Sequence, residues 1–480
     1  MVCQYDLAVL GGGSAGLAAA REAVHCGKSV VLIEPDRLGG TCVNWGCIPK
    51  KLFWYRSGKW SEQSRREERE GTVDTKAQFP WEEFKRVRDG YISELNSRYG
   101  QRLSAEKVDW VKGEAKFIGD NIIEVKECVE DCLDNSIDGL KSSKVSSGQT
   151  TSQIHFKHAI VATGSHSFIP AQIPGALQHG KTSNDFFNLQ HQPKRAVVIG
   201  FGYIGIELTH MLASLGTETW IVGRNATPLS GRFDSQLCEI SLEYLKALPN
   251  CHVMCNCTVK QVHERSVTVE TPELVTLDEI DFILFATGRV PSTASLACEN
   301  AHIELERGAV KVNAFHQSSN ASVFAVGDAV GRIMLTPVAI AAARSVIGQL
   351  YQKENAALFS YSNIPTVVFS HPPIAAVGLT EEEARTKHAK ILIYTSNYTP
   401  MQNVLAPNKP HSFVKIITTA PPEEQIIGIH IAGEGSDEAL QGFAVALAMG
   451  ARKADFLRTV AIHPTAAEEI LFTLNSQPAN

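Results

Sequence analysis

Two copies of one pattern, a glycine-rich turn between an apolar strand and a helix, constrain this chain more than any other feature. The first copy has its glycines at 11–16, after a strand predicted at 5–10. The second has them at 200–205, after a strand predicted at 195–199. Such glycines let the backbone approach a pyrophosphate, while the helix N-terminus offers its N–H groups. Two units of this kind predict two dinucleotide sites on two parallel sheets, the alternative being glycine turns without a ligand.

The residue that ends the second strand of each unit indicates which nucleotide it takes. Glu34 ends the strand at 29–34, where a carboxylate accepts hydrogen bonds from a ribose. The matching strand of the second copy ends at Arg224, which would pair with a 2′-phosphate. Arg232 follows as a candidate second clamp. This favours NADP over NAD at the second site, against the alternative of a solvated arginine at a strand end.

Cys42 and Cys47 are a candidate redox pair, but their spacing alone does not decide it. In a regular helix their Cα atoms would lie roughly 8–9 Å apart, beyond the ~7 Å that a disulfide spans. A bond would need a distorted first turn, for which Gly46 gives the freedom. At a helix N-terminus the dipole would stabilise a thiolate. Two unrelated buried cysteines are the other interpretation.

Further candidate residues follow apolar strands or lie near the C-terminus. His463 precedes Glu468, and a carboxylate that orients an imidazole is what acid–base support of thiol chemistry requires. A single histidine is, however, more often structural. Asp328 ends the strand Val-Phe-Ala-Val-Gly-Asp and suits a ribityl or ribose hydroxyl, or a helix N-cap. Two glycine turns add candidates at Thr163, Gly164 and Gly288.

Composition excludes several classes of protein. The 480 residues suggest about three domains, and 44% apolar with 20% charged residues is ordinary for a globular chain. A net charge of −6 argues against a nucleic-acid binder. No stretch reaches the ~18 apolar residues of a membrane span, and no leader precedes the first strand, so we expect no membrane and a cytoplasmic location. Eleven cysteines without zinc-site spacing predict neither a disulfide scaffold nor a metal site.

The local composition of the sequence changes twice along the chain. A polar, Ser-rich segment at 126–153 interrupts a β-rich stretch, and we expect it to be a surface loop. Beyond about residue 363, β-rich runs precede an Ala-rich helical stretch at 438–449, which predicts a third, α+β domain. We therefore expect four segments: 1–160 with the first glycine turn and the insertion, 161–288 with the second glycine turn, 289–362, and 363–480 as the α+β part.

Taken together, these motifs resemble the pyridine nucleotide–disulfide oxidoreductase family over nearly the whole chain apart from the insertion. The most specific strings lie at 39–51, 286–291, 327–328, 335–337, 370–373 and 463–465. The resemblance implies an α/β fold of two Rossmann-like dinucleotide-binding domains plus a C-terminal α+β dimerisation domain. In these terms 1–160 and 289–362 would be the two parts of the FAD-binding or central domain, 161–288 the NADPH-binding domain, and 363–480 the dimerisation or interface domain. It also implies a homodimer that uses FAD and NADPH to reduce glutathione disulfide.

The same resemblance implies a role for each matching residue. Cys47 would be the flavin-proximal thiol and Cys42 the interchange thiol, with His463 from the partner chain, oriented by Glu468, as the proton shuttle. Tyr203 would cover the flavin, beside a Lys50–Glu207 ion pair. The implied FAD contacts are Gly11, Gly13, Ser14, Ala15, Gly16, Glu34, Gly40, Thr41, Cys42, Lys50, Thr163, Gly164, Asp328, Leu335, Thr336 and the partner's His463. Those for NADPH are Gly200, Gly202, Tyr203, Ile204, Glu207, Arg224, Arg232 and Gly288, and those for glutathione disulfide are Ser14, Arg21, Tyr99 and Arg344.

Rival interpretations and departures from the family pattern remain. Arg21 and Arg344 disfavour trypanothione, and the absence of cysteine after Cys298 excludes the redox tail of large thioredoxin reductases. An NAD-linked dihydrolipoamide dehydrogenase and a flavin-binding protein without catalysis are the alternatives. Three departures stand out. Gly205 replaces an alanine frequent in NADP-using relatives, a one-residue insertion displaces Arg232, and Arg98 and Arg102 add positive charge near the expected substrate mouth.

Overall fold

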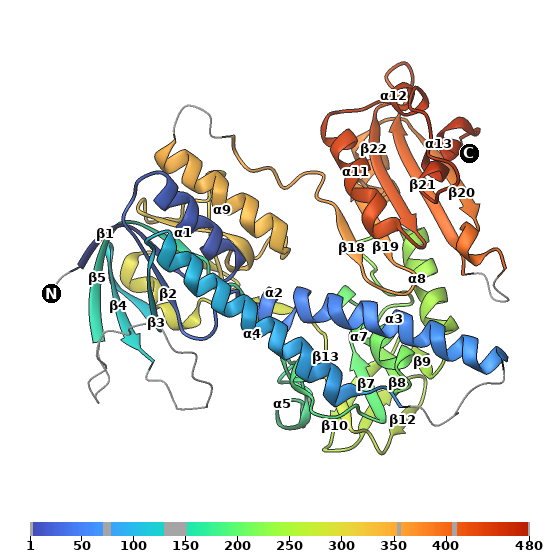
Figure 1. The fold of residues 1–480 in the computed structure, drawn as a ribbon, viewed down its shortest axis with the longest axis horizontal. Helices are drawn as coiled ribbons and strands as arrows, with labels where there is room; N and C mark the ends of the chain where they lie inside the picture. The colour runs from blue at the N-terminus through green and yellow to red at the C-terminus, as the bar shows by residue number, and fades with distance from the viewer. Residues whose placement is uncertain (1–2, 71–77, 129–150, 353–356, 406–409, 479–480) are drawn as a thin grey trace. The chain divides into compact units, whose positions relative to one another are not determined.

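The computed structural model describes residues 3–70, 78–128, 151–352, 357–405 and 410–478, which form two compact units (Figure 1). Unit 1 comprises residues 1–49, 86–166 and 289–360, and unit 2 comprises 50–85, 167–288 and 361–480. Two long helices, α3 (Cys47–Glu70) and α4 (Trp81–Ala105), contain two of the five points where the chain passes from one unit to the other. The finer division into four segments stays a prediction.

Unit 1 is built on a largely parallel sheet. Its strands are β1 (Cys3–Leu10), β2 (Val30–Glu34), β3 (Asp109–Gly119), β4 (Ile122–Glu127), β5 (Thr151–Val161) and β17 (Val323–Ala325). β1 lies between β2 and β5, β3 extends the sheet beyond β2, and β17 extends it beyond β5, all in parallel. β4 joins β3 and β5 through antiparallel pairs. This arrangement brings strand ends that are far apart in sequence to one edge.

The alternation of side chains along β1 covers both faces of this sheet. Leu7 and Val9 pack on one face, with helices α1 (Ser14–His25) and α9 (Thr336–Tyr351). Those two helices lie side by side in Figure 1. Ala8 and Leu10 pack on the opposite face, against Phe117 and its neighbours. Burial on both faces explains why β1 and β2 read as continuous apolar runs.

The polar segment predicted as a loop at 126–153 begins later and ends earlier than expected. Lys126 lies in β4 opposite Thr151 of β5, and Val125 lies opposite Ser152. Polar side chains alternate with apolar ones there, and a strand with one solvated face accommodates that pattern. The predicted loop boundaries were therefore wrong at both ends, and residues 129–150 lie outside the described part of the chain.

Short elements complete unit 1. Helix α2 (Gly40–Trp45) precedes α3, and the 3₁₀ helix η3 (Gly327–Val330) precedes α9. The remaining pieces are β6 (Ser165–Ser167), which pairs with β14 (Arg289–Pro291), the hairpin β15 (Leu305–Glu306) with β16 (Ala309–Val310), and the 3₁₀ turns η1 (Ala294–Leu296) and η2 (Cys298–Ala301). The loops around β6 and η3 lie next to β5 and β17, whose ends define one edge of the sheet.

Unit 2 contains a second parallel sheet. Its strand order is β13 (Phe282–Phe285), β7 (Arg195–Ile199), β8 (Glu218–Val222) and β9 (Cys251–Met254). Helices α7 (Tyr203–Ser214) and α8 (Ser235–Ala247) connect these strands, and α5 (Ala176–His179) and α6 (Ser183–Asn188) precede them. A three-stranded antiparallel sheet of β10 (Thr258–Val262), β11 (Val267–Glu270) and β12 (Leu274–Leu277) completes this part. The predicted α/β class with two glycine-turn units is confirmed.

The C-terminal part of unit 2 is an antiparallel sheet with helices. The order is β18 (Thr366–Val368), β19 (Ile374–Gly378), β22 (Ile426–Ala432), β21 (Ser412–Thr419) and β20 (Ile391–Tyr398). Helices α11 (Ser436–Ala448) and α13 (Glu468–Asn475) supply Leu440 and Ile470 to its core, and α10 (Glu381–Lys387), α12 (Lys453–Leu457) and η4 (Met401–Asn403) connect the rest. The expected α+β domain is confirmed, with its helix starting two residues before the predicted 438.

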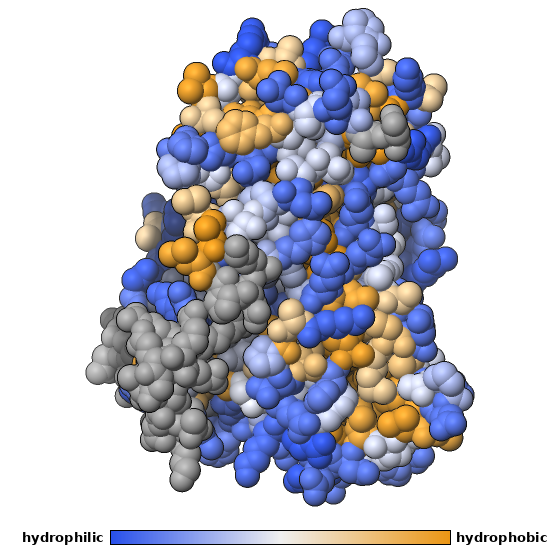
Figure 2. Space-filling model, turned by 90° about the vertical axis from the view of Figure 1, so that its right-hand side faces the viewer, coloured by the Kyte–Doolittle hydropathy of each residue, from blue (hydrophilic) through white to orange (hydrophobic). Residues whose placement is uncertain are grey.

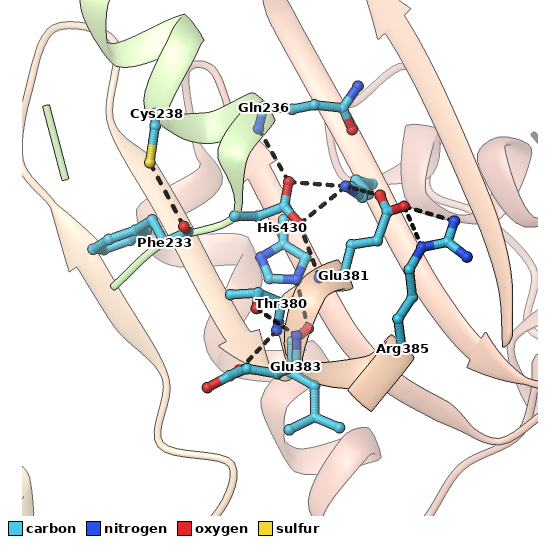
Figure 3. A network of polar contacts seen from close by, with 11 residues as sticks. Phe233, Gln236, Cys238, Thr380, Glu381, Glu383, Arg385 and His430 are labelled. Carbon is cyan, nitrogen blue, oxygen red and sulfur yellow. Dashed lines mark hydrogen bonds and ion pairs between the residues drawn. The ribbon is translucent and has the colours of Figure 1, made fainter. Parts of the chain in front are cut away.

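A buried ionic cluster joins the two parts of unit 2 (Figure 3). Lys415 of β21 contacts the Asp234 carboxylate at 2.9 Å and the Glu381 carboxylate at 2.6 Å. Only 1% of the Lys415 and Asp234 side chains is exposed. Asp234 also caps the N-terminus of α8, where it accepts from the Gln236 N–H. A buried charge is tolerated only when it is paired, so these contacts tie α8 to the C-terminal sheet.

Apolar side chains are exposed on the C-terminal part of unit 2. Val460 is 91% exposed, Met449 81% and Ile462 77%. Figure 2 faces the side on which α12, α13 and β20 lie in Figure 1, and orange apolar groups are scattered there among blue ones. Within the described residues, no helix is both long and apolar enough to cross a membrane.

Candidate active site

The first glycine turn leaves no room for larger residues. Gly11 has φ +110°, and a Cβ there would lie 2.4 Å from the Ala162 carbonyl oxygen. A Cβ on Gly16 would lie 1.8 Å from the Gly11 oxygen. Gly13 caps α1, and Gly40 approaches it so closely that a Cβ on Gly40 would be 2.7 Å from the Gly13 Cα. No side chain of this turn therefore covers the backbone where α1 begins, so a pyrophosphate could approach the backbone N–H groups there.

The second glycine turn repeats this geometry in unit 2. Gly200 has φ +126°, and its Cβ would lie 2.4 Å from the Ala286 carbonyl oxygen. A Cβ on Gly205 would lie 2.1 Å from the Gly200 oxygen. Gly202 caps α7, so Tyr203 and Ile204 are its first two residues, and Gly288 follows β13 with φ +126°. Each unit thus presents the start of one helix behind a bare glycine turn.

Polar groups suited to a dinucleotide lie near the first turn. The Glu34 carboxylate accepts the N–H groups of Gly12 at 2.6 Å and Asp36 at 2.9 Å. Burial nevertheless raises the pKa of Glu34. Asp328 accepts from the Ser165 hydroxyl at 2.5 Å. The Thr163 hydroxyl is buried without a protein partner. The unpaired Thr163 hydroxyl and the glycine turn together suit the polar groups of FAD. Gly164, the other predicted FAD contact here, is the next residue in the chain.

The two candidate thiols lie on separate helices. α2 ends at Trp45 and α3 begins at Cys47, with Gly46 between them at φ −147° and ψ −115°. The Cys42 sulfur is in hydrogen-bonding contact with the Cys47 sulfur and with the Ser14 and Thr336 hydroxyls. The Cys47 sulfur lies 3.6 Å from the Thr336 hydroxyl. Both sulfurs are free thiols in this structure, and together they lie where α9 begins.

The contact between the sulfurs makes Cys42 hard to ionise. Its hydrogen bond to Cys47 raises the pKa of Cys42 well above the ordinary range, and burial and the Cys47 charge add to this. The hydroxyls of Ser14 and Thr336 act in the opposite direction but do not cancel it. Ionisation of Cys42 would break its hydrogen bond and bring two negative sulfurs together. A base must therefore take this proton if Cys42 is to act as a nucleophile.

One turn beyond Cys47, a buried ion pair forms within unit 2. Lys50 contacts Glu207 at 2.9 Å, with side chains 14% and 5% exposed. Glu207 also accepts the N–H of Phe369 at 3.0 Å. The Lys50 ammonium lies 3.7 Å from the centre of the Phe369 ring. These contacts hold one ammonium in a fixed place on α3.

The structure brings His463 and Glu468 together at the start of α13. The His463 Nδ1 lies 3.1 and 3.2 Å from the two carboxylate oxygens of Glu468. Glu468 is fixed by the N–H of Thr465 and is 6% exposed, whereas the imidazole is 79% exposed. The Nδ1–H donates to the carboxylate, which leaves Nε2 outward as a proton acceptor. A fixed carboxylate behind an open imidazole suits acid–base chemistry.

The two candidate phosphate clamps lie on the exposed segment between β8 and α8. Arg224 and Arg232 are both exposed, and within the described residues neither guanidinium has an ion-pair or hydrogen-bond partner. Gly223 lies under the Phe201 ring, since a Cβ there would meet it at 2.2 Å. Free guanidiniums beside the second turn are available to an anion.

The candidate substrate residues occupy unit 1, with one unexpected partner. Arg21 donates two hydrogen bonds to Glu106, at 2.7 and 3.0 Å. Tyr99 lies on α4, and Arg344 lies exposed on α9. The expected extra positive charge of Arg98 and Arg102 is partly neutralised, because Arg98 pairs with Glu94 and Arg102 with Glu106. Each of these two arginines thus has an acidic partner four residues away along the chain.

The predicted residues divide between the two units. Unit 1 holds the glycine turn at 11–16, Glu34, both thiols, Asp328, the FAD residues Ala15, Thr41 and Leu335, and the substrate set. Unit 2 holds Lys50, Glu207, Tyr203, the nicotinamide-nucleotide set, His463 and Glu468. No group of three or more His, Cys, Asp or Glu side chains that could hold a metal ion occurs within the described residues.

Sequence reasoning missed four residues. Ser165 and Arg289 support Asp328, since Arg289 donates to the Ser165 hydroxyl at 2.7 Å. Glu106 pairs with Arg21, and Thr465 fixes Glu468. Two of the four lie within motifs that the sequence analysis used: Arg289 follows Gly288, and Thr465 is part of the His-Pro-Thr string. Glu106 gave no signal, because an acid after a charged helix is usually solvated.

Comparison with known proteins agrees with this geometry. The family model described as pyridine nucleotide-disulphide oxidoreductase matches residues 5–343, and the model for the dimerisation domain of that family matches 364–472. A protein of Debaryomyces hansenii named glutathione reductase is 36% identical over 494 aligned positions, which cover 98% of each chain. Both the matched length and the identity exceed what a shared fold alone would produce. The chain therefore belongs to the pyridine nucleotide-disulphide oxidoreductase family.

Proposed function

We propose that this protein reduces glutathione disulfide to two glutathione molecules with electrons from NADPH. The observation that carries the proposal is the pair of free thiols, Cys42 and Cys47, on the consecutive helices α2 and α3 beside the Thr336 hydroxyl at the start of α9. The name of the Debaryomyces hansenii relative supports the choice of substrate. Family membership implies FAD and a nicotinamide nucleotide, and Arg224 favours the phosphorylated one.

The residues present fit both cofactors. The turn at 11–16, Glu34, Thr163 and Asp328 would hold FAD, and the turn at 200–205 with Arg224 would hold NADPH. When bound, these cofactors supply the two electrons that reopen a Cys42–Cys47 disulfide. Lys50, fixed by Glu207, places a buried ammonium one turn from Cys47. Tyr203, the first residue of α7, is proposed to close over the site.

The thiols then transfer those electrons to the substrate. His463 takes the proton of Cys42, whose sulfur attacks one sulfur of glutathione disulfide and forms a mixed disulfide. The glutathione thiolate that leaves takes the proton back from His463. Cys47 next attacks the Cys42 sulfur, which closes the protein disulfide and releases the second glutathione. The substrate is reduced by two electrons, and the thiol pair is oxidised by two.

Glu468 gives His463 its role in this sequence. Its carboxylate holds the imidazole by Nδ1, so that Nε2 is the atom that gains and loses the proton. We propose that His463 serves the thiols of the partner subunit in a homodimer. The match of residues 364–472 to a dimerisation domain supports a dimer.

Turnover measurements test the proposal. The purified FAD-loaded protein should oxidise NADPH much faster with glutathione disulfide than with lipoamide, thioredoxin or trypanothione disulfide. NADH should be a poor donor, and Cys42→Ser should abolish turnover. Faster reaction of lipoamide with the NAD couple would instead identify a dihydrolipoamide dehydrogenase. Flavin binding without any disulfide reduction would reject catalysis.

A further inference from the structure

A second arginine is tied to Arg21 through one carboxylate. Arg21 lies on α1, and its Nε and Nη2 donate to the two oxygens of Glu106 at 2.7 and 3.0 Å. Arg102, near the end of α4, donates its Nε to the same carboxylate at 3.0 Å. Glu106 follows α4 directly, so it connects the two helices. The two guanidiniums are therefore held beside each other.

The charge of this cluster remains positive. Hydrogen bonds from Arg21 lower the pKa of Glu106 despite its partial burial, and those from Arg102 add to this, so the carboxylate is ionised at neutral pH. One negative and two positive groups leave a net charge of +1. The Arg102 side chain is 59% exposed, and within the described residues its two terminal nitrogens have no hydrogen-bond partner. Those nitrogens are available to an anion.

The cluster and the thiols both lie next to helix α1. The hydroxyl of Ser14, the first residue of α1, contacts Cys42, and Arg21 follows seven residues later, on the same face of the helix. Tyr99 is one turn before Arg102, and burial is the main cause that raises its pKa. The charge of Cys42 raises it further, whereas Arg102 and Arg21 lower it. Tyr99 is thus within electrostatic reach of both the Cys42 sulfur and the arginine cluster. A substrate whose sulfur meets Cys42 would therefore lie beside α1, the helix that carries Arg21.

We propose that Arg102 is a second carboxylate-binding residue for the disulfide substrate, and that Glu106 is the positioning residue that holds it beside Arg21. Glutathione disulfide carries several carboxylates, and a guanidinium binds a carboxylate through two parallel hydrogen bonds. Glu106 uses one edge of Arg21 and the Nε of Arg102, which leaves the terminal nitrogens of Arg102 outward. This inference rests on the proposed reduction of glutathione disulfide.

Arg98 provides a matched control for Arg102. It lies on the same helix four residues earlier, is 63% exposed and pairs with its own acid, Glu94, at 2.5 Å. Loss of either arginine removes one positive charge from α4. Only Arg102 shares a carboxylate with Arg21. A difference between the two variants therefore reports the cluster rather than general attraction of an anion.

The test compares steady-state kinetics of the FAD-loaded dimer with NADPH. Arg102→Gln should raise the KM for glutathione disulfide about three- to tenfold, as expected for loss of a partly exposed charge-assisted contact, with little change in kcat. Arg98→Gln should leave KM within about twofold. With an esterified glutathione disulfide, whose carboxylates are neutral, the difference between the two variants should disappear. Equal KM values for the variants, or a difference that persists with the ester, would overturn the role of Arg102.

Glu106→Gln separates positioning from charge compensation. It makes the cluster more positive, so a simple counter-ion role predicts a lower KM. The positioning role predicts a higher KM, because neither arginine is then held, and a lower value would overturn it. If the wild-type protein neither binds nor reduces glutathione disulfide, the proposed function fails and this inference with it. If it does so and only the variants disagree, the inference alone fails.

Discussion

At the scale of single residues, Gly205 illustrates how backbone proximity limits side-chain choice. A Cβ there would lie 2.1 Å from the Gly200 oxygen and 3.4 Å from the Ala286 methyl group. The alanine that NADP-using relatives often carry would require the turn to shift. Gly205 is therefore explained by helix–strand packing in this chain, and it gives no argument against NADP. The choice of nucleotide depends on residues beyond the turn.

Arg224 is the residue we expect to select the nucleotide. Its guanidinium has no partner within the described residues, so it can pair with a 2′-phosphate. A charge-assisted contact of this kind contributes roughly 1.5–3 kcal/mol, or about ten- to a hundredfold in affinity. Arg224→Ala should raise the KM for NADPH by such a factor and leave NADH nearly unchanged. Steady-state kinetics with both nucleotides measure this, and an equal loss for both would contradict the assignment.

Arg232 serves as the comparison for that experiment. The insertion at Ser230 and Gly231 places it one position later than the family pattern, and it is exposed. We expect Arg232→Ala to have a smaller effect on NADPH than Arg224→Ala. A larger effect would exchange the two roles.

Sequence patterns predicted which residues take part in the chemistry better than they predicted which side chains pair with one another. The glycine turns and the His463–Glu468 pair were visible because strand, turn and helix signals are local in sequence. The pairs Arg21–Glu106 and Lys50–Glu207 join residues 85 and 157 positions apart. The first gave no sequence signal. The second came only from the family resemblance, because no local rule connects such distant side chains.

At the scale of elements, the cluster around Lys415 fastens α8 and α10 to β21. Asp234, Lys415 and Glu381 come from three elements, and Arg385 reaches the cluster from the exposed side of α10 (Figure 3). Burial acts to raise the pKa of Asp234, but His430, Lys415 and the Glu381 N–H together lower it below the ordinary value. The contacts therefore hold Asp234 ionised in the interior.

Removal of one member should be costly. Lys415→Met would leave the Asp234 carboxylate buried without its cation, and breaking a buried pair costs roughly 3–5 kcal/mol. Arg385→Gln, which removes an exposed partner of Glu381, should cost at most about 1 kcal/mol. Urea unfolding followed by fluorescence measures both. A loss for Lys415→Met no larger than that of the control would show that the cluster contributes little.

The buried histidine of this cluster makes stability depend on pH. Burial lowers the pKa of His430, against the opposing effect of Asp234. The unfolded chain takes up a proton as pH falls through about 6.5, whereas the folded chain does not. Stability is therefore complete above about pH 6.5 and falls below it, by at most about 1.4 kcal/mol per pH unit from this residue. Asp234 contributes only at more acidic pH, because its lowered pKa acts below about 4.

Urea midpoints between pH 7.5 and 5 test this dependence. His430→Gln keeps a donor for the Leu379 carbonyl, which His430 Nε2 reaches at 2.9 Å. The variant should lose part of the slope that the wild type shows below pH 6.5. Equal slopes would assign the acid sensitivity to other groups, of which buried His210, with its strongly lowered pKa, is the first to examine.

The type of a helix or strand was predictable where its apolar pattern extended over many residues, but its first and last residues were not. The strands at 5–10 and 195–199 and the helix after 436 match their patterns. The paired ends of the 126–153 segment depend on the pairing of β4 with β5. The break at Gly46, by contrast, lies where the sequence allowed a distorted turn. A polar strand with one solvated face has the composition of a loop, so composition misplaced those boundaries.

At the scale of the whole molecule, the thiols and the His463–Glu468 pair lie in different units. The proposed homodimer gives each active site the thiols of one chain and His463 of the other. Chains with Cys42→Ser and chains with His463→Gln should each be nearly inactive as homodimers. A hybrid dimer would contain one site with both lesions and one without any. We expect the purified hybrid to recover a sizeable fraction of the activity of one wild-type site.

The hybrid experiment discriminates because the two arrangements predict opposite results. If each chain formed a complete site alone, every site of the hybrid would carry one lesion. No recovery in a hybrid whose composition is verified by differential tagging would therefore reject the shared site. A mixture of Cys42→Ser and Cys47→Ser chains is the control, since both lesions affect the same thiol pair and no site is intact in either arrangement.

The order of strands in unit 1 also has a consequence for synthesis of the protein. β17 pairs with β5 but follows it by about 160 residues. At roughly 5–20 residues per second on the ribosome, the last three residues of β5, Ala159–Val161, wait on the order of ten to thirty seconds for this neighbour. An open strand edge invites pairing with other chains. During that interval this short part of the β5 edge is exposed in the nascent polypeptide, whereas β17 covers it in the finished sheet.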